Sequence, residues 1–153
     1  MALKNQQDNV YSVGLRNVGS YQVSGTPYMT GSTNMTLNKT LRHTFPYVTK
    51  SITVICTHGA NDIRVHFHPG VPSPSISGDG LPNAGGYATG DSVQGKHHYT
   101  TVPSSNGSVT FDVKVKEIYI TSPAAASSYE IFAELTQIPT SRMYALSGTG
   151  IEG

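Results

Sequence analysis

Histidines carry the clearest chemical spacing in this sequence. His66 and His68 alternate along an expected strand, so both rings would project from the same face of a sheet. A His-x-His pair on a strand is a recognised metal-ligand spacing, and His97 and His98 stand elsewhere in the chain as further nitrogen donors. The simpler interpretation is a pair of solvent-facing histidines on the outer face of the strand. We expect that arrangement, so His66 and His68 are weak metal candidates and no cofactor is expected.

The surroundings of the histidine pair argue against a metal site. Cupins place such a pair on a jelly roll and add a glutamate four residues after the second histidine. Pro72 stands at that position here, and no acidic residue lies nearby in the sequence. A metal ion would therefore lack a carboxylate ligand at this site.

Motifs for phosphate binding and nucleophilic catalysis are missing from the sequence. The run Gly148–Gly153 has the glycine spacing of a dinucleotide fingerprint, but without the strand, turn and helix that the fingerprint needs. The glycines between residues 78 and 95 include no Gly-Lys-Ser/Thr, and no serine stands in a nucleophile-elbow sequence. Asp62, Asp79 and Asp91 are too widely spaced to nominate a carboxylate pair. We therefore expect no catalytic residues and no enzyme.

The composition predicts a single β-rich domain. The chain has 153 residues, enough to bury a substantial core, and glycine, serine, threonine and tyrosine are plentiful. Ten basic and nine acidic side chains are spread evenly, which gives a net charge of +1. Because no basic run is available for phosphate contacts, we expect no nucleic-acid partner.

Cys56 is the only cysteine, so the sequence excludes an internal disulfide. It shares the parity of Ile52 and Val54, which predicts a small buried apolar side chain. A chain of this size without disulfides favours folding in a reducing compartment, and its first residues contain no apolar segment of the kind found in signal peptides. No stretch approaches membrane-spanning length, so we expect no membrane partner.

The stretch from Ser108 to Thr136 has the strongest strand pattern. Apolar and polar side chains alternate in two runs, with Val109, Phe111, Val113 and Val115 apolar in the first and Tyr129, Ile131, Ala133 and Leu135 in the second. The alternation changes phase at Lys116–Glu117, so the apolar residues after this point would face the other side of the strand. An extra residue inserted there as a β-bulge would turn them back toward the core. We expect the two runs to pair as an antiparallel hairpin whose outer face sets lysines beside glutamates. The charged residues concerned are Lys114, Lys116, Glu130 and Glu134.

Further strands complete a two-layer fold. Ser51–Thr57 is predicted as a buried strand and Asp62–His68 as its partner, after a turn at His58–Asn61. Asn106-Gly107 is the strongest turn signal, whereas residues 69–95 form a long Pro/Gly/Ser loop. No segment has a convincing 3.6-residue period. About eight strands separated by turns predict an all-β, antiparallel, jelly-roll-like β-sandwich.

Both ends of the chain are rich in glycine. Gly19, Gly25 and Gly31 recur every six residues, a spacing that disfavours a helix because each glycine costs about 1 kcal/mol there. The expected division is an extended N-terminal arm over residues 1–32, a β-sandwich over 33–138 and an extended C-terminal tail over 139–153.

Two arrangements are open for residues 19–31. They could form an edge strand of the same domain, or an arm that reaches over a neighbouring subunit and gains main-chain hydrogen bonds there. We take the arm as the working prediction, anchored through apolar and aromatic side chains. The partner-binding candidates in the arm and tail are Tyr21, Val23, Tyr28, Met29, Tyr144 and Ile151.

Three stretches of the sequence carry a resemblance to a known kind of protein. They are Arg16–Ser32, Phe45–Val54, and Lys116–Ile120 leading into Tyr129–Thr136. The first contains the run Gly-Ser-Tyr-Gln-Val-Ser-Gly-Thr-Pro-Tyr-Met-Thr-Gly, the second Phe-Pro-Tyr-Val-Thr-Lys-Ser, and the third Tyr-Glu-Ile-Phe-Ala-Glu-Leu-Thr. Together they resemble small virion structural proteins of tailed phages that infect marine bacteria, of the kind that decorate or cement a capsid.

This resemblance implies a β-rich decoration protein present in many copies on the capsid exterior. Its partners would be the major capsid protein and further copies of itself, in a homo-oligomer such as a trimer. It would fold in the host cytoplasm and act without a cofactor. The near-neutral charge suits this role, because identical subunits packed together would repel one another little.

Two other functions are open from the sequence. A tail, neck or fibre component of the same kind of particle would share the fold. A carbohydrate-binding β-sandwich would use aromatic and polar side chains on or beside the long loop, although the chain has no tryptophan to stack on a sugar. Those side chains would be Tyr87, His97, His98 and Tyr99.

Overall fold

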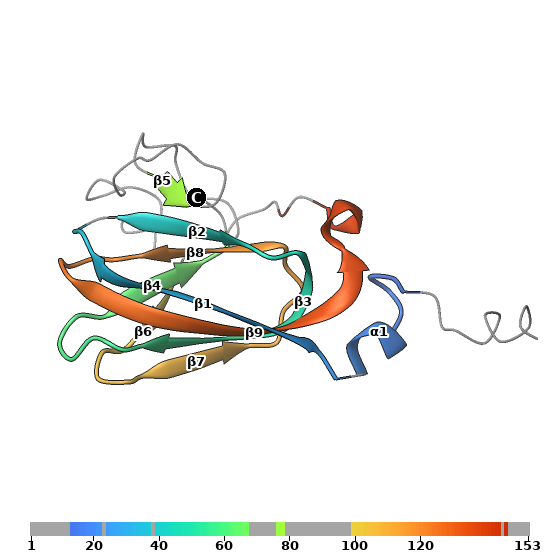
Figure 1. Cartoon of the computed structure of the whole chain (residues 1–153), viewed down its shortest axis with the longest axis horizontal. Helices are drawn as coiled ribbons and strands as arrows, with labels where there is room; N and C mark the ends of the chain where they lie inside the picture. Colours follow the sequence, from blue (N-terminus) through green and yellow to red (C-terminus); the bar gives the residue numbers. More distant parts are fainter. Residues whose placement is uncertain are drawn as a thin grey trace, which may run out of the picture.

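Two β-sheets lie face to face in the computed structural model (Figure 1), which describes residues 13–22, 24–37, 39–67, 76–78, 99–144 and 146. The four-stranded sheet has the order β1 (Thr26–Met35), β9 (Ser127–Pro139), β3 (Tyr47–Cys56) and β7 (Ser108–Phe111). The five-stranded sheet has the order β5 (Ile76–Gly78), β2 (Thr40–Thr44), β8 (Glu117–Thr121), β4 (Ile63–His66) and β6 (Thr100–Val102). The described residues also include a short helix, α1 (Gly19–Gln22), and a 3-10 turn at Thr140–Arg142.

The all-β sandwich predicted from the sequence is confirmed. Neighbouring strands in the described residues run antiparallel, except that β2 and β5 are parallel. Nine strands are described, against about eight expected. The specifically jelly-roll connection is not established by this strand order and stays a prediction.

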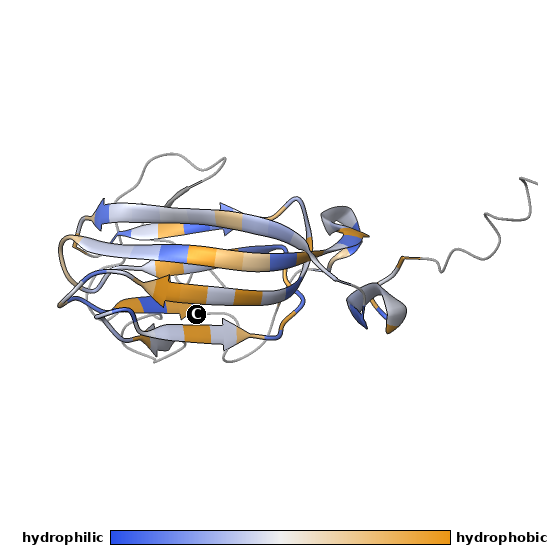
Figure 2. Ribbon diagram, turned by 60° about the horizontal axis from the view of Figure 1, so that its bottom comes forward, coloured by the Kyte–Doolittle hydropathy of each residue, from blue (hydrophilic) through white to orange (hydrophobic). Residues whose placement is uncertain are grey.

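The core lies between the sheets and is built by two-residue alternation, which Figure 2 shows as changing colours along the strands. The register of β3 and β9 pairs Ile52 with Ala133 and Val54 with Ile131, so all four side chains point inward. The facing sheet contributes further fully buried residues, namely Ile118, Ile120, Ile63 and Val65. Full burial of one such aliphatic side chain stabilises a fold by about 1.5–3 kcal/mol, so this layer supplies the main stabilising term.

Cys56 lies in this core, as the sequence predicts. Its side chain is fully buried, and its thiol donates a hydrogen bond to the backbone oxygen of Asn61 at 3.2 Å. Burial raises the pKa of the Cys56 thiol above its usual value, because the thiolate would lose its hydration.

We expect Cys56 to be inert toward thiol reagents in the native protein. Ellman's reagent at neutral pH should label Cys56 only as the chain unfolds, with full labelling in concentrated urea, since the reactive species is the thiolate. Free glutathione in the same buffer serves as the control for reagent activity. Rapid stoichiometric labelling without denaturant would contradict the buried position.

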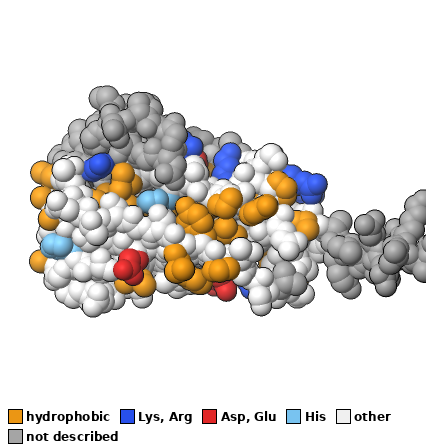
Figure 3. All heavy atoms as spheres, in the orientation of Figure 1, with side chains coloured by type: hydrophobic (Ala, Val, Ile, Leu, Met, Phe, Trp, Pro, Cys, Tyr) orange, Lys and Arg blue, Asp and Glu red, His pale blue; other side chains and the backbone are white. Residues whose placement is uncertain are grey.

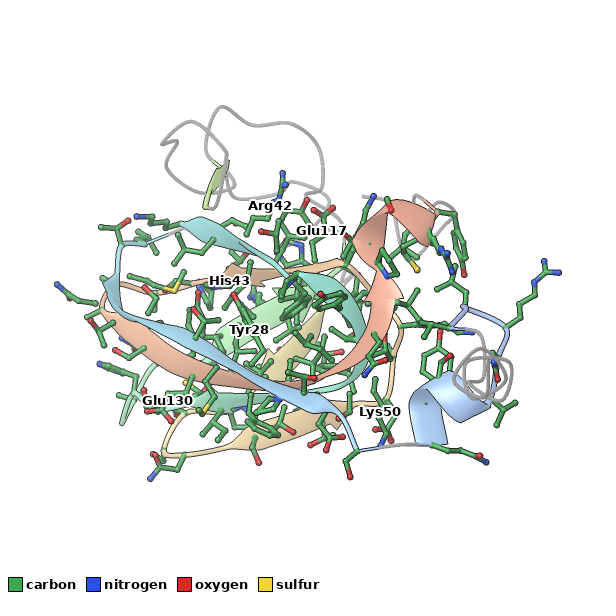
Figure 4. The ribbon with its side chains drawn as sticks, turned by 45° about the vertical axis from the view of Figure 1, so that its right-hand side comes forward. Tyr28, Arg42, His43, Lys50, Glu117 and Glu130 are labelled. Carbon is green, nitrogen blue, oxygen red and sulfur yellow. The ribbon has the colours of Figure 1, made fainter. Side chains whose placement is uncertain are left out.

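A polar contact bridges the two sheets inside the apolar core. His43 on β2 and Tyr129 on β9 are both buried, and the His43 Nε2 atom lies 2.6 Å from the Tyr129 hydroxyl. Their rings also meet edge to face, with centroids 5.7 Å apart. Figure 4 shows His43 in the space between the sheets. The contact satisfies two polar groups that would otherwise be buried at a cost.

Tyr129→Phe tests this bridge. The variant keeps the ring but removes the hydroxyl from the His43 Nε2 atom, so we expect a loss of about 1–3 kcal/mol in the free energy of unfolding. Urea unfolding followed by circular dichroism measures the change. Tyr47→Phe, at a tyrosine that is 44% exposed, is the matched control and should leave stability unchanged. Equal stability of Tyr129→Phe and wild type would remove the bridge from the stabilising interactions.

The predicted hairpin of residues 108–136 is wrong. The first run contains β7, which pairs with β3 and not with β9, and its continuation β8 belongs to the five-stranded sheet, so neither strand pairs with β9. The chain leaves β7 after Phe111 and crosses to the other sheet before β8, and the parity slip at Lys116–Glu117 marks this crossing rather than a bulge. Thr49 supports the crossing segment, since its Oγ1 atom donates to the Val113 oxygen at 2.7 Å.

The charge pairing expected across that hairpin is replaced by another. Glu134 lies 4.0 Å from the Lys50 Nζ atom on β3 and accepts a hydrogen bond from the Ser51 hydroxyl at 3.0 Å. Because these groups are partly exposed, the pair adds little stability and mainly helps to set the register of β3 and β9.

The turn at Asn106-Gly107 is confirmed. Ser105 and Asn106 have φ angles of 60° and 65°, and the turn connects β6 with β7. A Cβ atom on Gly107 would lie 2.4 Å from the backbone oxygen of Pro103, so only glycine fits there.

Residues 26–32 form an edge strand of the sandwich, so the predicted arm is wrong over this range. β1 pairs with β9 from Thr26 opposite Leu135 to Ser32 opposite Tyr129. Tyr28 points inward and meets the Phe45 ring edge to face, with centroids 5.3 Å apart. This inward aromatic contact and the backbone pairing hold β1 to its own subunit. The boundary of the sandwich therefore moves from residue 33 to Thr26.

The described residues before β1 and after β9 also pack on their own chain. Val13, Leu15 and Tyr21 contact a second small core formed by Val48, Ile138 and Met143. Figure 1 shows α1 and the segment after β9 at the same end of the sandwich. The described parts of the predicted arm and tail are therefore folded back.

The short helix α1 contradicts the expectation that the glycine spacing excludes helix. Asn17 starts it, because its side-chain Oδ1 atom accepts a hydrogen bond from the Gly19 N–H at 3.0 Å. The Tyr21 N–H donates to the Val18 oxygen, and the Tyr21 hydroxyl donates to the Leu15 oxygen. For a helix of one turn, these local hydrogen bonds are enough to offset the free-energy cost of placing glycine in a helix.

Candidate interaction surfaces

His66 is buried on β4, so the expectation of a solvent-facing ring is wrong. Only 2% of the residue is exposed, and its Nε2 atom lies 2.7 Å from the Thr121 hydroxyl on β8. The ring stacks on Tyr119, with centroids 5.6 Å apart and planes 20° apart. His68, His97 and His98 lie outside the described residues. Among the residues that are described, no group of three or more His, Cys, Asp or Glu side chains could hold a metal ion.

The outer face of the five-stranded sheet carries a polar cluster around β8, in which His66 and Tyr119 are buried and Arg42 and Glu117 are partly exposed. Backbone pairing aligns Arg42, Tyr119 and His66 in one row across β2, β8 and β4. The Tyr119 hydroxyl donates to Glu117 Oε1 at 3.2 Å, and the Arg42 Nε atom lies 3.1 Å from Glu117 Oε2. Figure 4 shows Arg42 and Glu117 side by side on the outer side of this sheet. Glu117 thus interacts with both Tyr119 and Arg42, whereas the buried Arg42 Nε atom has no partner of hydrogen-bond geometry among the described residues.

Arg64 and Tyr99 lie beside this cluster. The Arg64 guanidinium carbon is 4.4 Å from the centre of the Tyr99 ring, a cation–π contact. One ring face of Tyr99 is therefore covered and cannot stack on a sugar. Tyr87, His97 and His98, the other residues of the carbohydrate hypothesis, lie outside the described residues. The structure thus adds no support for a sugar site.

The environment of Tyr119 changes the pKa of its phenol group. Burial, and secondly the negative charge of Glu117, raise the pKa of Tyr119 well above its usual value. The folded protein therefore keeps this phenol neutral at pH values where an unfolded tyrosine, with a pKa of about 10, ionises. The contribution to stability is fully present below pH about 10 and is lost as the pH rises beyond it.

Tyr119→Phe should therefore weaken the alkaline dependence of stability. In urea unfolding at a series of pH values between about 8 and 11, the free energy of unfolding of wild type should fall more steeply than that of Tyr119→Phe. Tyr47→Phe controls for the loss of one exposed tyrosine and should keep the wild-type slope. Parallel slopes for all three proteins would show that Tyr119 ionises equally in both states.

An apolar hollow lies on the outer face of the four-stranded sheet. Met29 on β1 stands opposite Phe132 on β9, and they are 75% and 40% exposed. Gly31 stands opposite Glu130, which in turn stands opposite Ile55 on β3. A depression of about 780 Å³ lies over these strands, and Gly31 is among its lining residues. We call it the sheet groove, defined by Met29, Gly31, Ile55, Glu130 and Phe132.

Further exposed apolar side chains stand at the end of the sandwich that carries α1. Val18 and Tyr144 are 65% and 62% exposed, and Arg16 near Val18 is also exposed. Tyr144 lies close to Tyr21, whose pKa is raised by burial and secondly by Tyr144. We call Arg16, Val18 and Tyr144 the terminal patch. Figure 3 shows Lys or Arg side chains beside hydrophobic ones at this end, and further hydrophobic side chains around β1 and β9.

The predicted partner-binding residues fall in different environments. Met29 and Tyr144 are exposed, whereas Tyr21 is half-buried against the second small core and Tyr28 points into the main core. Tyr28 is partly buried by its contact with the core, and its role as a partner residue stays a prediction. Val23 and Ile151 lie outside the described residues.

Sequence reasoning missed Phe132 and Ile55 as surface residues. Phe132 occupies the polar side of the β9 alternation, between Glu130 and Glu134. An apolar residue on an otherwise polar strand face was the available signal. Ile55 breaks the β3 alternation in the same way, since it is apolar on the side opposite Ile52 and Val54.

Comparison with known proteins found no match to this chain. No protein-family model matches the sequence, and neither a curated protein nor a solved structure matches it. Within the described residues, no helix is both long and apolar enough to cross a membrane. The described residues form a β-sandwich with exposed apolar side chains at the sheet groove and at the terminal patch.

Proposed function

We propose that this chain is a structural subunit of a phage particle, which decorates the capsid by binding the major capsid protein and neighbouring copies of itself. The observation that carries the proposal is the pair of separate apolar surfaces on one rigid sandwich. Met29 and Phe132 are exposed on a sheet face, and Val18 and Tyr144 at one end. A subunit of a closed shell needs more than one contact surface, because it touches several neighbours at once.

The exposed apolar side chains favour protein contacts over other roles. Covering a side chain such as Met29 or Phe132 contributes up to about 1.5–3 kcal/mol. Such contacts are weak singly and add up when many copies bind one lattice. The sequence resemblance to capsid-decorating proteins supports the same conclusion. The net charge of +1 also allows close packing of identical copies.

The corrected fold changes how the contacts would be made. Tyr28 and the rest of residues 26–32 hold β1 on its own sheet, so they are not available as a strap over a neighbour. The proposal therefore assigns contacts to the folded faces, where Met29 and Tyr144 are exposed. A folded surface loses less conformational entropy on binding than a segment that orders during assembly.

The direct test is the protein composition of purified particles from the phage that encodes this chain. Quantitative mass spectrometry should find the protein in a copy number comparable to that of a capsid subunit, because a decorating protein follows the shell lattice. Gold-labelled antibody should mark heads in electron micrographs. Label confined to tails, necks or fibres would favour the alternative of a tail component. Absence of the protein from particles would contradict a virion role.

A further inference from the structure

The sheet groove carries a carboxylate, Glu130, that has no ion-pair partner among the described residues. The ion pairs among the described residues join Glu117 to Arg42 and Glu134 to Lys50. Glu130 is exposed and makes no ion pair with any described residue. Figure 4 places Glu130 on the outside of the ribbon, whereas Tyr28 and His43 lie between the sheets. A ligand of the groove should therefore bring a positive charge.

Because the walls of the groove are apolar, a matching ligand would carry an apolar group beside its positive charge. Met29 and Phe132 face each other across β1 and β9, and Ile55 lies one strand further in the row of Glu130. An aromatic or branched side chain that enters between them would cover apolar surface on both strands. The matching partner is thus a cation next to an exposed apolar side chain.

The terminal patch has this combination. Val18 and Tyr144 are exposed, and Arg16 is an exposed cation near Val18. The neighbouring cations at this end are engaged: Lys114 Nζ donates to the Leu15 oxygen, and Arg142 Nη1 donates to the Val13 oxygen. Arg16 makes no ion pair with any residue that the structure describes, so its guanidinium is available to a carboxylate.

The two surfaces of one molecule lie too far apart to meet. Phe132 is in the middle of β9, whereas Ile138, at the base of the terminal end, is six residues further along the strand. At about 3.3 Å per residue, this separation is about 20 Å. A contact between groove and patch must therefore join two copies. Different surfaces meeting head to tail generate closed rings or extended arrays, according to the rotation between copies.

We propose that the sheet groove of one copy binds the terminal patch of a second copy, with Val18 and Tyr144 against Met29 and Phe132 and with Arg16 paired to Glu130. This inference deepens the proposed function, since it supplies the copy-to-copy contact of a decorating subunit. The acid of one surface and the base of the other also disfavour groove-to-groove pairing, where two Glu130 carboxylates would meet.

Charge reversal on the purified full-length chain tests the contact. Wild type should self-associate with rising concentration in sedimentation velocity runs at low salt. Glu130→Arg and Arg16→Glu should each raise the dissociation constant about tenfold or more, because like charges then meet at the interface. The double variant restores opposite charges and should return the constant to near the wild-type value. Asp112→Arg, at an exposed acid outside the groove, should leave association unchanged.

Apolar substitutions supply a second arm of the experiment. Val18→Ser should weaken association, whereas Leu37→Ser should not, because Leu37 is 57% exposed in the turn between β1 and β2, away from both surfaces. Thermal unfolding checks that every variant is folded. A wild type that is monomeric at every concentration overturns the contact, and so does association that ignores the charge reversals or is not rescued in the double variant.

These outcomes are separable from those of the proposed function. Particles that contain the protein, together with a purified chain that stays monomeric, would leave the virion role intact and remove the groove-to-patch contact. Self-association with the predicted rescue, together with particles that lack the protein, would keep the contact and remove the virion role.

Discussion

β9 is the strand on which the other parts of the structure depend. It pairs with β1 on one side and β3 on the other, and its inward side chains form one wall of the core. The same strand supplies Tyr129 to the polar bridge with His43 and, on its opposite face, supplies Glu130 and Phe132 to the sheet groove. Because strand side chains alternate strictly, packing on the inner face fixes which residues stand on the outer face.

The sequence was sufficient for features that arise from local pattern. Alternation of apolar and polar residues predicted the sandwich and the buried thiol of Cys56, and Asn106-Gly107 predicted a turn. The sequence did not determine which strands pair with one another. The alternating runs Val109–Val115 and Tyr129–Leu135 are compatible with a hairpin or with separate partners in the two sheets, and the choice depends on packing between residues far apart in the chain.

The surface sites were predictable only in part, for a related physical reason. Met29 lies on an edge strand, and its exposure follows from the inward contact of its neighbour Tyr28 with Phe45, which the sequence does not encode locally. His66 was expected in solvent because one strand face was assumed to be wet. The outer face of β8 and β4 is instead buried, and hydroxyl groups such as that of Thr121 satisfy the ring nitrogen.

Gly31 links the depth of the groove to the attachment of the edge strand. A Cβ atom at this position would lie 2.5 Å from the backbone oxygen of Tyr129, so any larger residue would force β1 away from β9. The hollow therefore cannot be filled by a simple substitution at its floor while the sheet stays intact. Substitutions that change the shape or charge of this surface are therefore expected at its walls, for example at positions 29, 55, 130 and 132.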